Sequence, residues 1–337
     1  MDTERQLILR IARRVPSRLH FASVKNLTLG IGDDAAILSP LPESDWVITC
    51  DSFLENIHFL ANAHPAESVG YKSLARAASD IAAMGATPRW FLLALALPAS
   101  KTGSWLDRFS SGMGRAARAL GLSLIGGDTT KSPSLFISIT VLGEIPPGRA
   151  VTRSGARPGD LIYVSDTLGE AALGLAWIRS RSNSPLPIPL PAFLRRHLYP
   201  RIPVALGSWL ASRRIASSMM DISDGLSTDL SRLCSASRVG ARLDAAKIPI
   251  VSIPHSLPSR LRRAHLHPLA LALHGGDDYA LLFTVPPPQA AALRRAPGAR
   301  SIRCIGEITR SRKLVLVNSA GKSQPLVSRG WDPFASR

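Results

Sequence analysis

Residues 68–97 read SVGYKSLARAASDIAAMGATPRWFLLALAL, and this stretch decides the fold class. Its first part, residues 68–84, has the apolar spacing and the small side chains of a packed helix. Gly85 then ends the helix in the manner of a C-cap. Residues 90–97 form an apolar run of strand length, which predicts a buried β-strand. A helix followed closely by a buried strand indicates an α/β protein.

The sequence on either side adds elements of the same two kinds. Residues 1–16 interleave charged and apolar side chains at helical spacing, which predicts an amphipathic helix. A second buried helix is predicted at residues 105–120, where Gly121 ends it. The remaining strands predicted in this half are residues 35–39, 46–49, 123–125 and 135–143.

Residues 145–160, IPPGRAVTRSGARPGD, are rich in turn-forming and basic residues, and they indicate a domain boundary. We therefore predict one domain over residues 1–148 and a second over residues 149–337. The second half offers a strand at 161–164, a helix from about Gly169, an exposed proline-rich loop at 182–191 and a helix at 204–213. The spacing is too irregular for a (β/α)₈ barrel, so two unequal α/β domains are predicted.

Composition excludes several classes of protein. The 337 residues are 45% hydrophobic and 19% charged, which argues against disorder. The apolar run at 90–99 is far shorter than the roughly 20 residues of a membrane-spanning helix, and no apolar signal-peptide core follows the N-terminus. Cys50, Cys234 and Cys304 are odd in number and far apart, which fits a reducing compartment. We expect a cytoplasmic protein with no membrane contact.

The formal net charge of +17 raises the alternative of nucleic-acid binding. The basic residues are mostly Arg, and they are scattered from Arg5 to Arg337 without a long basic run. A solvated basic surface is therefore the favoured interpretation, because net charge by itself bears on solubility and steering.

Aspartate outnumbers glutamate, and many of the aspartates lie in short motifs beside Gly or Ser. Any one motif has a structural explanation as a turn or a helix N-cap. Their recurrence, with most placed after an apolar strand, instead indicates one site built at strand ends. The motifs are Gly32-Asp33-Asp34, Asp51, Asp80, Gly127-Asp128-Thr129-Thr130, Asp221-Ile222-Ser223-Asp224-Gly225 and Gly276-Asp277-Asp278.

Several separate aspartates suit Mg²⁺, which prefers hard oxygen ligands and shares them with substrate phosphates. Arginines near the motifs, such as Arg153, make phosphoryl transfer the natural reaction class. Gly321-Lys322-Ser323 ends like a P-loop, but Leu316 occupies the place of its first glycine. Residues 30–35, GIGDDA, match a dinucleotide fingerprint, yet two carboxylates there would repel a pyrophosphate. Standard nucleotide-binding motifs are therefore excluded.

The order and wording of the motifs resemble the thiamine-monophosphate kinase family, within the superfamily that includes aminoimidazole ribonucleotide synthetase. The resemblance covers residues 30–334. It rests on GIGDDAAIL, VITCDSFLENIHF, SLARAASDIAAMGATPRW, LIGGDTT, RAVTRSGARPGD, MMDISDGLSTDL, HGGDDYALLFTV and RGWDPF. It implies transfer of the ATP γ-phosphoryl group to thiamine monophosphate, which gives thiamine diphosphate and ADP. It also implies an N-terminal domain that binds ATP and Mg²⁺ and forms a homodimer through its sheet, a C-terminal α/β/α domain, and an active site in the cleft between them.

The resemblance also assigns roles to residues, motif by motif. The implied Mg²⁺ ligands are Asp34, Thr49, Cys50, Asp51, Asp80, Asp128, Asp221 and Asp224. The implied ATP contacts are Gly127, Asp128, Arg153 and Ser223. The implied thiamine contacts are His58, Asp277 and Trp331, of which Trp331 suits a cation–π contact with the thiazolium ring. We expect Asp34, Asp51, Asp128 and Arg153 to be the catalytic group, while Asp33 and Asp278 receive no role.

Three positions depart from the family pattern. Cys50 stands where Thr is common, Asp277 stands where Glu is common, and Pro333 stands where His is usual. Two alternatives stay open: another ATP-dependent enzyme of the superfamily, similar to aminoimidazole ribonucleotide synthetase, and a non-catalytic basic homologue that binds nucleic acid.

Overall fold

The computed structural model describes residues 4–15, 27–29, 37–38, 43–180, 186–255, 257, 260–261 and 266–331. The chain forms two compact units. Unit 1 comprises Met1–Ile81 and Ala86–Gly148, and unit 2 comprises Ala82–Gly85 and Arg149–Arg337.

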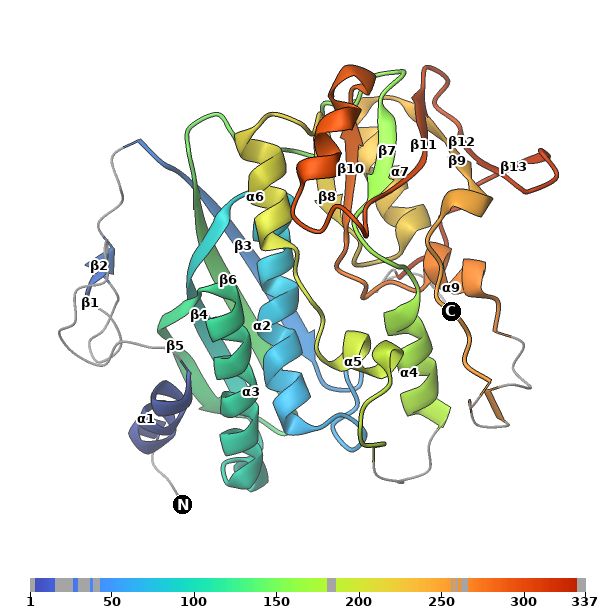
Figure 1. The fold of residues 1–337 in the computed structure, drawn as a ribbon. Helices are drawn as coiled ribbons and strands as arrows, with labels where there is room; N and C mark the ends of the chain where they lie inside the picture. Colours follow the sequence, from blue (N-terminus) through green and yellow to red (C-terminus); the bar gives the residue numbers. More distant parts are fainter. Residues whose placement is uncertain are drawn as a thin grey trace. The chain divides into compact units, whose positions relative to one another are not determined.

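Unit 1 is built on a four-stranded sheet with one face covered by two helices, α2 (Ala66–Ala83) and α3 (Ser104–Leu120) (Figure 1). The strand order is β3 (Asp45–Leu54), β6 (Phe136–Ile145), β4 (Thr87–Leu97) and β5 (Ser123–Lys131). The β3–β6 and β6–β4 pairs are antiparallel, and the β4–β5 pair is parallel. Side chains alternate between the two faces of a strand, so every second residue packs beneath the helices.

Both predicted helix ends in this unit are confirmed. Gly85 has a φ of 78°, and Gly121 has a φ of 70° with its N–H donated to the Ala117 carbonyl. Both values lie in the left-handed region that favours glycine, so each glycine ends its helix as a C-cap.

Helices α2 and α3 pack at backbone distance. A Cβ at Gly70 would lie 2.0 Å from the Phe109 carbonyl oxygen, and a Cβ at Gly112 would lie 1.8 Å from the Glu67 carbonyl oxygen. Each contact requires a residue without a side chain, so the two glycines fix how closely the helices approach.

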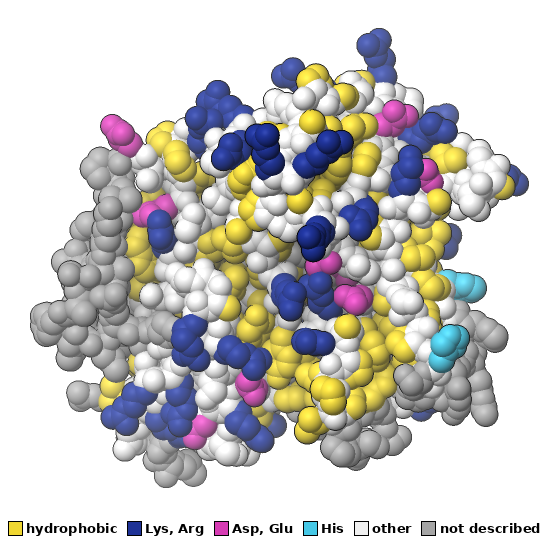
Figure 2. Space-filling view, in the orientation of Figure 1, with side chains coloured by type: hydrophobic (Ala, Val, Ile, Leu, Met, Phe, Trp, Pro, Cys, Tyr) yellow, Lys and Arg dark blue, Asp and Glu magenta, His cyan; other side chains and the backbone are white. Residues whose placement is uncertain are grey.

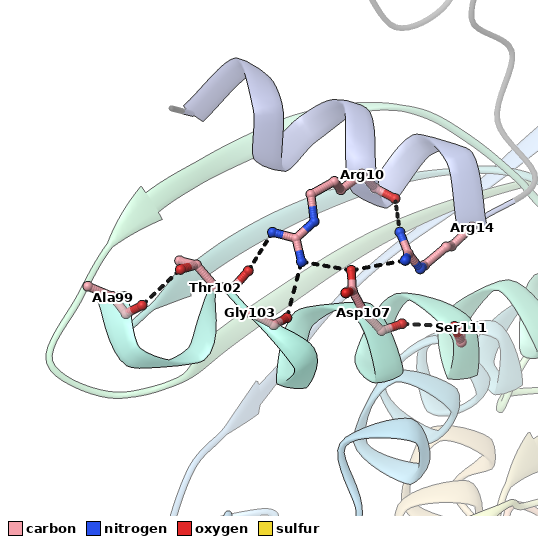
Figure 3. Close-up of polar contacts among 7 residues, drawn as sticks. All are labelled: Arg10, Arg14, Ala99, Thr102, Gly103, Asp107 and Ser111. Carbon is pink, nitrogen blue, oxygen red and sulfur yellow. Dashed lines mark hydrogen bonds and ion pairs between the residues drawn. The ribbon is translucent and has the colours of Figure 1, made fainter. Parts of the chain in front are cut away.

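The first helix, α1 (Glu4–Arg14), is attached to the start of α3 by a group of polar contacts (Figure 3). Arg10 Nη1 donates to the Thr102 carbonyl at 2.7 Å, and Arg10 Nη2 lies 2.8 Å from Asp107 Oδ1. Arg14 Nη2 lies 3.2 Å from the same carboxylate oxygen. One carboxylate on α3 therefore receives two guanidinium groups from α1.

Two short strands, β1 (Leu27–Leu29) and β2 (Ile37–Leu38), form a separate antiparallel sheet. Strand β2 lies in the predicted strand 35–39, whereas β1 was not predicted.

Unit 2 contains a seven-stranded sheet in the order β13-β12-β9-β11-β7-β10-β8 (Figure 1). Only the β12–β9 pair is parallel. Apolar side chains from the sheet and from α7 (Leu226–Ser237), including Leu230 and Leu282, form its main core. The strands are β7 (Leu161–Val164), β8 (Ser218–Asp221), β9 (Gly240–Asp244), β10 (Leu281–Val285), β11 (Arg303–Thr309), β12 (Leu314–Val317) and β13 (Ser323–Pro325).

Helices α4 (Glu170–Ser180) and α5 (Ala192–Leu198) lie side by side in this unit, and α7 packs against α9 (Pro268–His274) and the sheet. The helix expected from about Gly169 is present as α4. Of the predicted proline-rich loop, residues 186–191 are described: Ile188 is 97% exposed, whereas Leu190 and Pro191 are half-buried. The structure also describes helix α6 (Val204–Ser212) and the 3₁₀ turns η1 (Ala99–Lys101), η2 (Ala245–Lys247) and η3 (Pro287–Arg295).

Two acidic motifs lie inside strands, so the expectation that most motifs follow strands was wrong. Asp51 lies within β3 and Asp128 lies within β5, and Asp277 precedes β10. Strand β3 pairs with β6, and β5 pairs with β4, along stretches that include their polar residues and glycines. Tertiary pairing therefore overrides the weak strand propensity of these residues. Among the motifs that the structure describes, only Asp221 ends its strand as expected.

Among the helices in the described part of the chain, none has both the length and the apolar character that a membrane crossing requires.

Candidate active site

Hydroxyl and carboxylate side chains of β3 and α2 meet on the helix-covered face of the unit 1 sheet. Thr49 Oγ1 donates to Asp80 Oδ2 at 2.6 Å. Two residues along the strand, Asp51 forms a two-point ion pair with Arg76, with Nε–Oδ2 and Nη2–Oδ1 distances of 2.6 and 3.1 Å. The structure therefore brings three predicted ligands, Thr49, Asp51 and Asp80, to one face.

The electrostatics of this group favour a cation. Burial raises the pKa of Asp51, Arg76 lowers it, and the nearby charge of Asp80 raises it further. Arg76 pairs with Asp51, and the Asp80 carboxylate adds a second negative charge near it. Mg²⁺ commonly takes one or two carboxylates and completes its coordination with water and phosphate oxygens, so this oxygen pair with the Thr49 hydroxyl fits the ion.

Arg76, the ion-pair partner of Asp51, was not among the residues predicted from the sequence. It lies four residues before Asp80 on α2, and residues with that spacing share one helix face. The spacing was therefore the signal that could have found it.

His58 lies in the turn after β3 and adjoins the same group. Its Nδ1 accepts a hydrogen bond from the Leu54 N–H at 3.0 Å. Its ring stacks on Phe53 at a centroid distance of 5.8 Å, and the Arg76 guanidinium lies 5.2 Å from the centre of the Phe53 ring. His58 is thus joined to the Asp51–Arg76 pair through the Phe53 ring.

Cys50 and Asp128 point to the other face of the sheet. Cys50 follows Thr49 in the strand, and its Sγ lies 3.4 Å from Ser138 Oγ. Asp128 pairs with Ala94, and Ala94 pairs in turn with Ser138. Paired residues share a face, so both side chains lie on the open face, opposite Asp51. Asp128 is also separated from β3 by two strands.

In unit 2, the loop of residues 222–225 is the meeting point of three segments. It follows the buried Asp221, which ends β8. The Asp277 N–H donates to the Ser223 carbonyl at 2.7 Å, and the Trp331 N–H donates to the Asp224 carbonyl at 3.0 Å. The structure therefore brings together Ser223, Asp224, Asp277 and Trp331 with Asp221.

The Asp224 carboxylate is paired with Arg232 of α7, a residue that the sequence reasoning also missed. The same guanidinium donates to Asp229 Oδ1 at 3.0 Å, and the Asp224 N–H donates to Asp229 Oδ2 at 3.0 Å. Arg232 lies three residues after Asp229, a helical spacing that predicts the contact.

Asp277 is held by two further side chains. Tyr279 Oη donates to Asp277 Oδ1 at 2.8 Å, and His197 Nδ1 lies 3.8 Å from Oδ2. His197 is fully buried and Asp277 is partly exposed, so the carboxylate has a fixed inner side and an accessible outer side. The neighbouring Asp278 accepts the Gly169 N–H at 2.9 Å, which assigns it a structural role at the start of α4.

The other predicted residues lie apart from these two groups. Gly127 is exposed in β5, and Arg153 is exposed at the start of unit 2, where its carbonyl accepts from Ser237 Oγ at 3.0 Å. Asp33, Asp34 and Pro333 lie outside the described residues. Within the described ranges, no three His, Cys, Asp or Glu side chains form a group that could hold a metal.

The surface in Figure 2 carries Lys and Arg side chains spread over the drawn face, with Asp and Glu side chains among them. They form no continuous basic stripe on that face.

Two family models match the chain. The AIR synthase related protein, N-terminal domain, matches residues 32–145, and the AIR synthase related protein, C-terminal domain, matches residues 157–318. Thiamine-monophosphate kinase of Escherichia coli K12 is 38% identical over 99% of this chain and 98% of its own length.

Two solved structures are similar over most of the chain. Thiamine-monophosphate kinase from Stenotrophomonas maltophilia K279a has a TM-score of 0.79 and 36% identity, and the match covers 92% of this chain and 95% of that one. AaThiL complexed with AMPPCP and TMP has a TM-score of 0.75 and 31% identity, and the match covers 90% of this chain and 92% of that one.

Proposed function

This chain belongs to the AIR synthase related family, as a thiamine-monophosphate kinase, and we propose that it transfers the ATP γ-phosphoryl group in one direct in-line step to the phosphate of thiamine monophosphate. The products are thiamine diphosphate and ADP. The observation that carries the proposal is the convergence of Ser223, Asp277 and Trp331 on one loop, because it joins a predicted ATP contact to two predicted thiamine contacts.

The acceptor needs no general base. The second pKa of a phosphate monoester is about 6, so its attacking oxygen is already ionised at neutral pH. The barrier comes from bringing one anion to another, and positive charge at the reacting phosphates offsets it. Arg153 would supply such charge to ATP, and an exposed guanidinium at the start of unit 2 is consistent with that role.

Thr49, Asp51 and Asp80 would hold Mg²⁺ in unit 1, and Asp221 would hold it in unit 2. The predicted ligands Asp34 and Asp224 would complete the set, together with the Cys50 carbonyl. When bound, Mg²⁺ neutralises phosphate charge and orients the reacting groups. Arg76 pairs with Asp51 in this structure, so it would keep the carboxylate ionised and oriented before the ion and ATP arrive.

On the acceptor side, His58, Asp277 and Trp331 would contact thiamine monophosphate. Tyr279 and His197 hold one side of the Asp277 carboxylate, which leaves its partly exposed side toward the ligand. Asp277 is one methylene shorter than the usual Glu, and this anchoring would set the reach of the shorter side chain.

We also propose a homodimer formed through the open face of the unit 1 sheet. Ile48 is 61% exposed and Phe136 is 38% exposed on this face, whereas Trp90 and Leu142 of the same face are buried in a small apolar cluster. Asp128 lies on the same face, so its carboxylate and the adjoining Gly127 would act in the site of the partner subunit.

We propose a site to which both domains contribute: residues 1–148 would supply most of the Mg²⁺ ligands, and residues 149–337 would add the ligands Asp221 and Asp224 and the ATP contacts Arg153 and Ser223. A cytoplasmic location is part of the same proposal, and the three free cysteines are consistent with it.

An acceptor-dependence assay tests the function. The expected result is Mg²⁺-dependent release of ADP that requires thiamine monophosphate and yields thiamine diphosphate in equal amount. Release with a purine ribonucleotide only would favour the enzyme class that resembles aminoimidazole ribonucleotide synthetase. Release that is equal with and without acceptor would leave a simple ATPase. No release with any acceptor, together with retained affinity for nucleic acid, would favour the non-catalytic alternative.

A further inference from the structure

Two neighbouring carbonyl groups in unit 2 each fix one predicted thiamine contact. The Ser223 carbonyl accepts the Asp277 N–H at 2.7 Å, and the Asp224 carbonyl accepts the Trp331 N–H at 3.0 Å. The loop of residues 222–225 thus acts on both contacts through its backbone, whereas its predicted roles toward ATP and Mg²⁺ use its side chains.

Both attached segments approach the loop at a glycine. A Cβ at Gly330 would lie 1.9 Å from the Asp224 carbonyl oxygen and 2.5 Å from Thr228 Oγ1. A Cβ at Gly276 would lie 2.5 Å from the Ser223 carbonyl oxygen. The carbonyl oxygen that accepts each hydrogen bond therefore occupies the space that a side chain would need on the residue before the donor, which is glycine in both cases.

The first turn of α7 holds the segment before Trp331. The Gly330 N–H donates to Thr228 Oγ1 at 3.0 Å, and the Arg329 N–H donates to Ser227 Oγ at 3.4 Å. Thr228 Oγ1 also lies 2.7 Å from Ser328 Oγ. Residues 328–331 are therefore attached at four successive positions, and supporting contacts of this kind are what hold a binding side chain within the roughly 0.5 Å that a productive site requires.

We propose that Gly330 and Thr228 are positioning residues for the thiamine ring, which act by docking residues 328–331 on the α7 turn so that Trp331 faces the acceptor. The inference rests on the proposed function, because it assumes that Trp331 contacts thiamine. It adds a specific cause: the place of the ring contact is set by backbone docking at Gly330, and not by the packing of Trp331 alone.

The first test is Gly330→Ala, with Gly103→Ala as the matched control, because a Cβ at Gly103 meets nothing within 4 Å. A displaced ring contact weakens acceptor binding in the ground state and the transition state alike, which raises KM and spares kcat. The expected result for Gly330→Ala is a KM for thiamine monophosphate raised about tenfold, with kcat and the KM for ATP within about twofold of wild type. Gly103→Ala should match wild type.

Calorimetric titration of thiamine monophosphate into enzyme with AMPPCP and Mg²⁺ gives the same comparison without turnover. The expected result is a Kd weakened about tenfold for Gly330→Ala. An unchanged Kd and KM in a folded Gly330→Ala variant would overturn the inference, and so would equal effects on the ATP and acceptor KM values.

Thr228→Val keeps the test decisive if Gly330→Ala does not fold. Valine has nearly the shape of threonine and removes only the group that binds Gly330 and Ser328. Thr228→Val should raise the acceptor KM by about threefold or more, and it should add nothing in a Trp331→Ala background, because the two changes remove one contact. Full additivity of the two variants would overturn the inference. If wild-type enzyme shows no ADP release that depends on thiamine monophosphate, the proposed function itself is overturned.

Discussion

The Asp229 side chain is fully buried in unit 2 beside a second carboxylate. Burial is the main cause that raises its pKa to about 6 from 3.8, and the Asp224 charge adds to it, while the N–H of Asp224 and Arg232 lower it. The folded protein therefore binds a proton at Asp229 more readily than the unfolded chain does. Stability from this proton is fully present below about pH 4 and is lost as pH rises through about 6.

Asp229→Asn removes this titration and tests it. We expect the unfolding free energy of wild type, taken relative to the variant, to fall by up to about 3 kcal/mol between pH 4 and pH 7, since the pKa difference is about two units. Urea unfolding of both proteins at the two pH values measures the change. A relative stability that stays constant, or that rises with pH, would contradict the raised pKa.

Single residues were predicted unevenly from the sequence, and the reason is physical. Asp51 and Asp80 were identified by motif, but Arg76, the partner of Asp51, was not: its spacing from Asp80 places it on the same helix face, while its contact with a strand 25 residues earlier depends on the tertiary fold. Asp278 was left without a role because its acceptor function toward Gly169 joins residues 109 positions apart. Contacts of that kind depend on the tertiary fold, and local pattern does not report them.

At the scale of elements, helices α1, α2, α3, α4 and α6 and the glycine ends of α2 and α3 were predicted, whereas α5, α7, α9 and the strand lengths were not. Strands β3 and β5 continue through Asp51 and Asp128, where polar residues and glycines are poor local strand formers. The error had a consequence for the site. Loop residues at strand ends can turn toward one another, but residues inside a strand are fixed to one face by the pleat. Cys50 and Asp51 therefore cannot both direct their side chains to one ion.

The glycine contacts between α2 and α3 give a test in which two effects have opposite signs. Helix propensity alone predicts that Gly112→Ala stabilises the protein by up to about 1 kcal/mol. The Glu67 carbonyl, 1.8 Å from the new Cβ, predicts the reverse. We expect destabilisation by about 2 kcal/mol or more, because the helices must move apart. Thermal unfolding of Gly112→Ala and Gly103→Ala measures it, and a raised Tm in the first variant would refute backbone-distance packing.

At the scale of the whole molecule, the proposed dimer through the open face of the unit 1 sheet can be tested at Ile48, which is exposed on that face. We expect wild type to sediment as a dimer at micromolar concentration. Ile48→Lys should shift it toward monomer, because burying a lysine ammonium in an interface is costly. Val327→Lys is the matched control, since Val327 is 53% exposed and belongs to unit 2. Equal sedimentation of all three proteins would exclude this face as the interface.

If Asp128 acts in the site as proposed, its position on that same face makes the proposed dimer a condition of catalysis. Asp51 and Asp128 point from opposite faces of one sheet with two strands between them, so one chain does not direct both toward the same ion.

If the partner supplies Asp128, a heterodimer of one Asp51→Asn chain and one Asp128→Asn chain contains one site with both changes and one site with neither. Each variant homodimer should be inactive and folded. Subunits mixed and allowed to exchange should then regain about a quarter of wild-type turnover, because half of the dimers are mixed and each has one intact site. If both residues instead served the site of their own chain, every site in the mixture would carry one change, and activity would stay at the level of the separate variants.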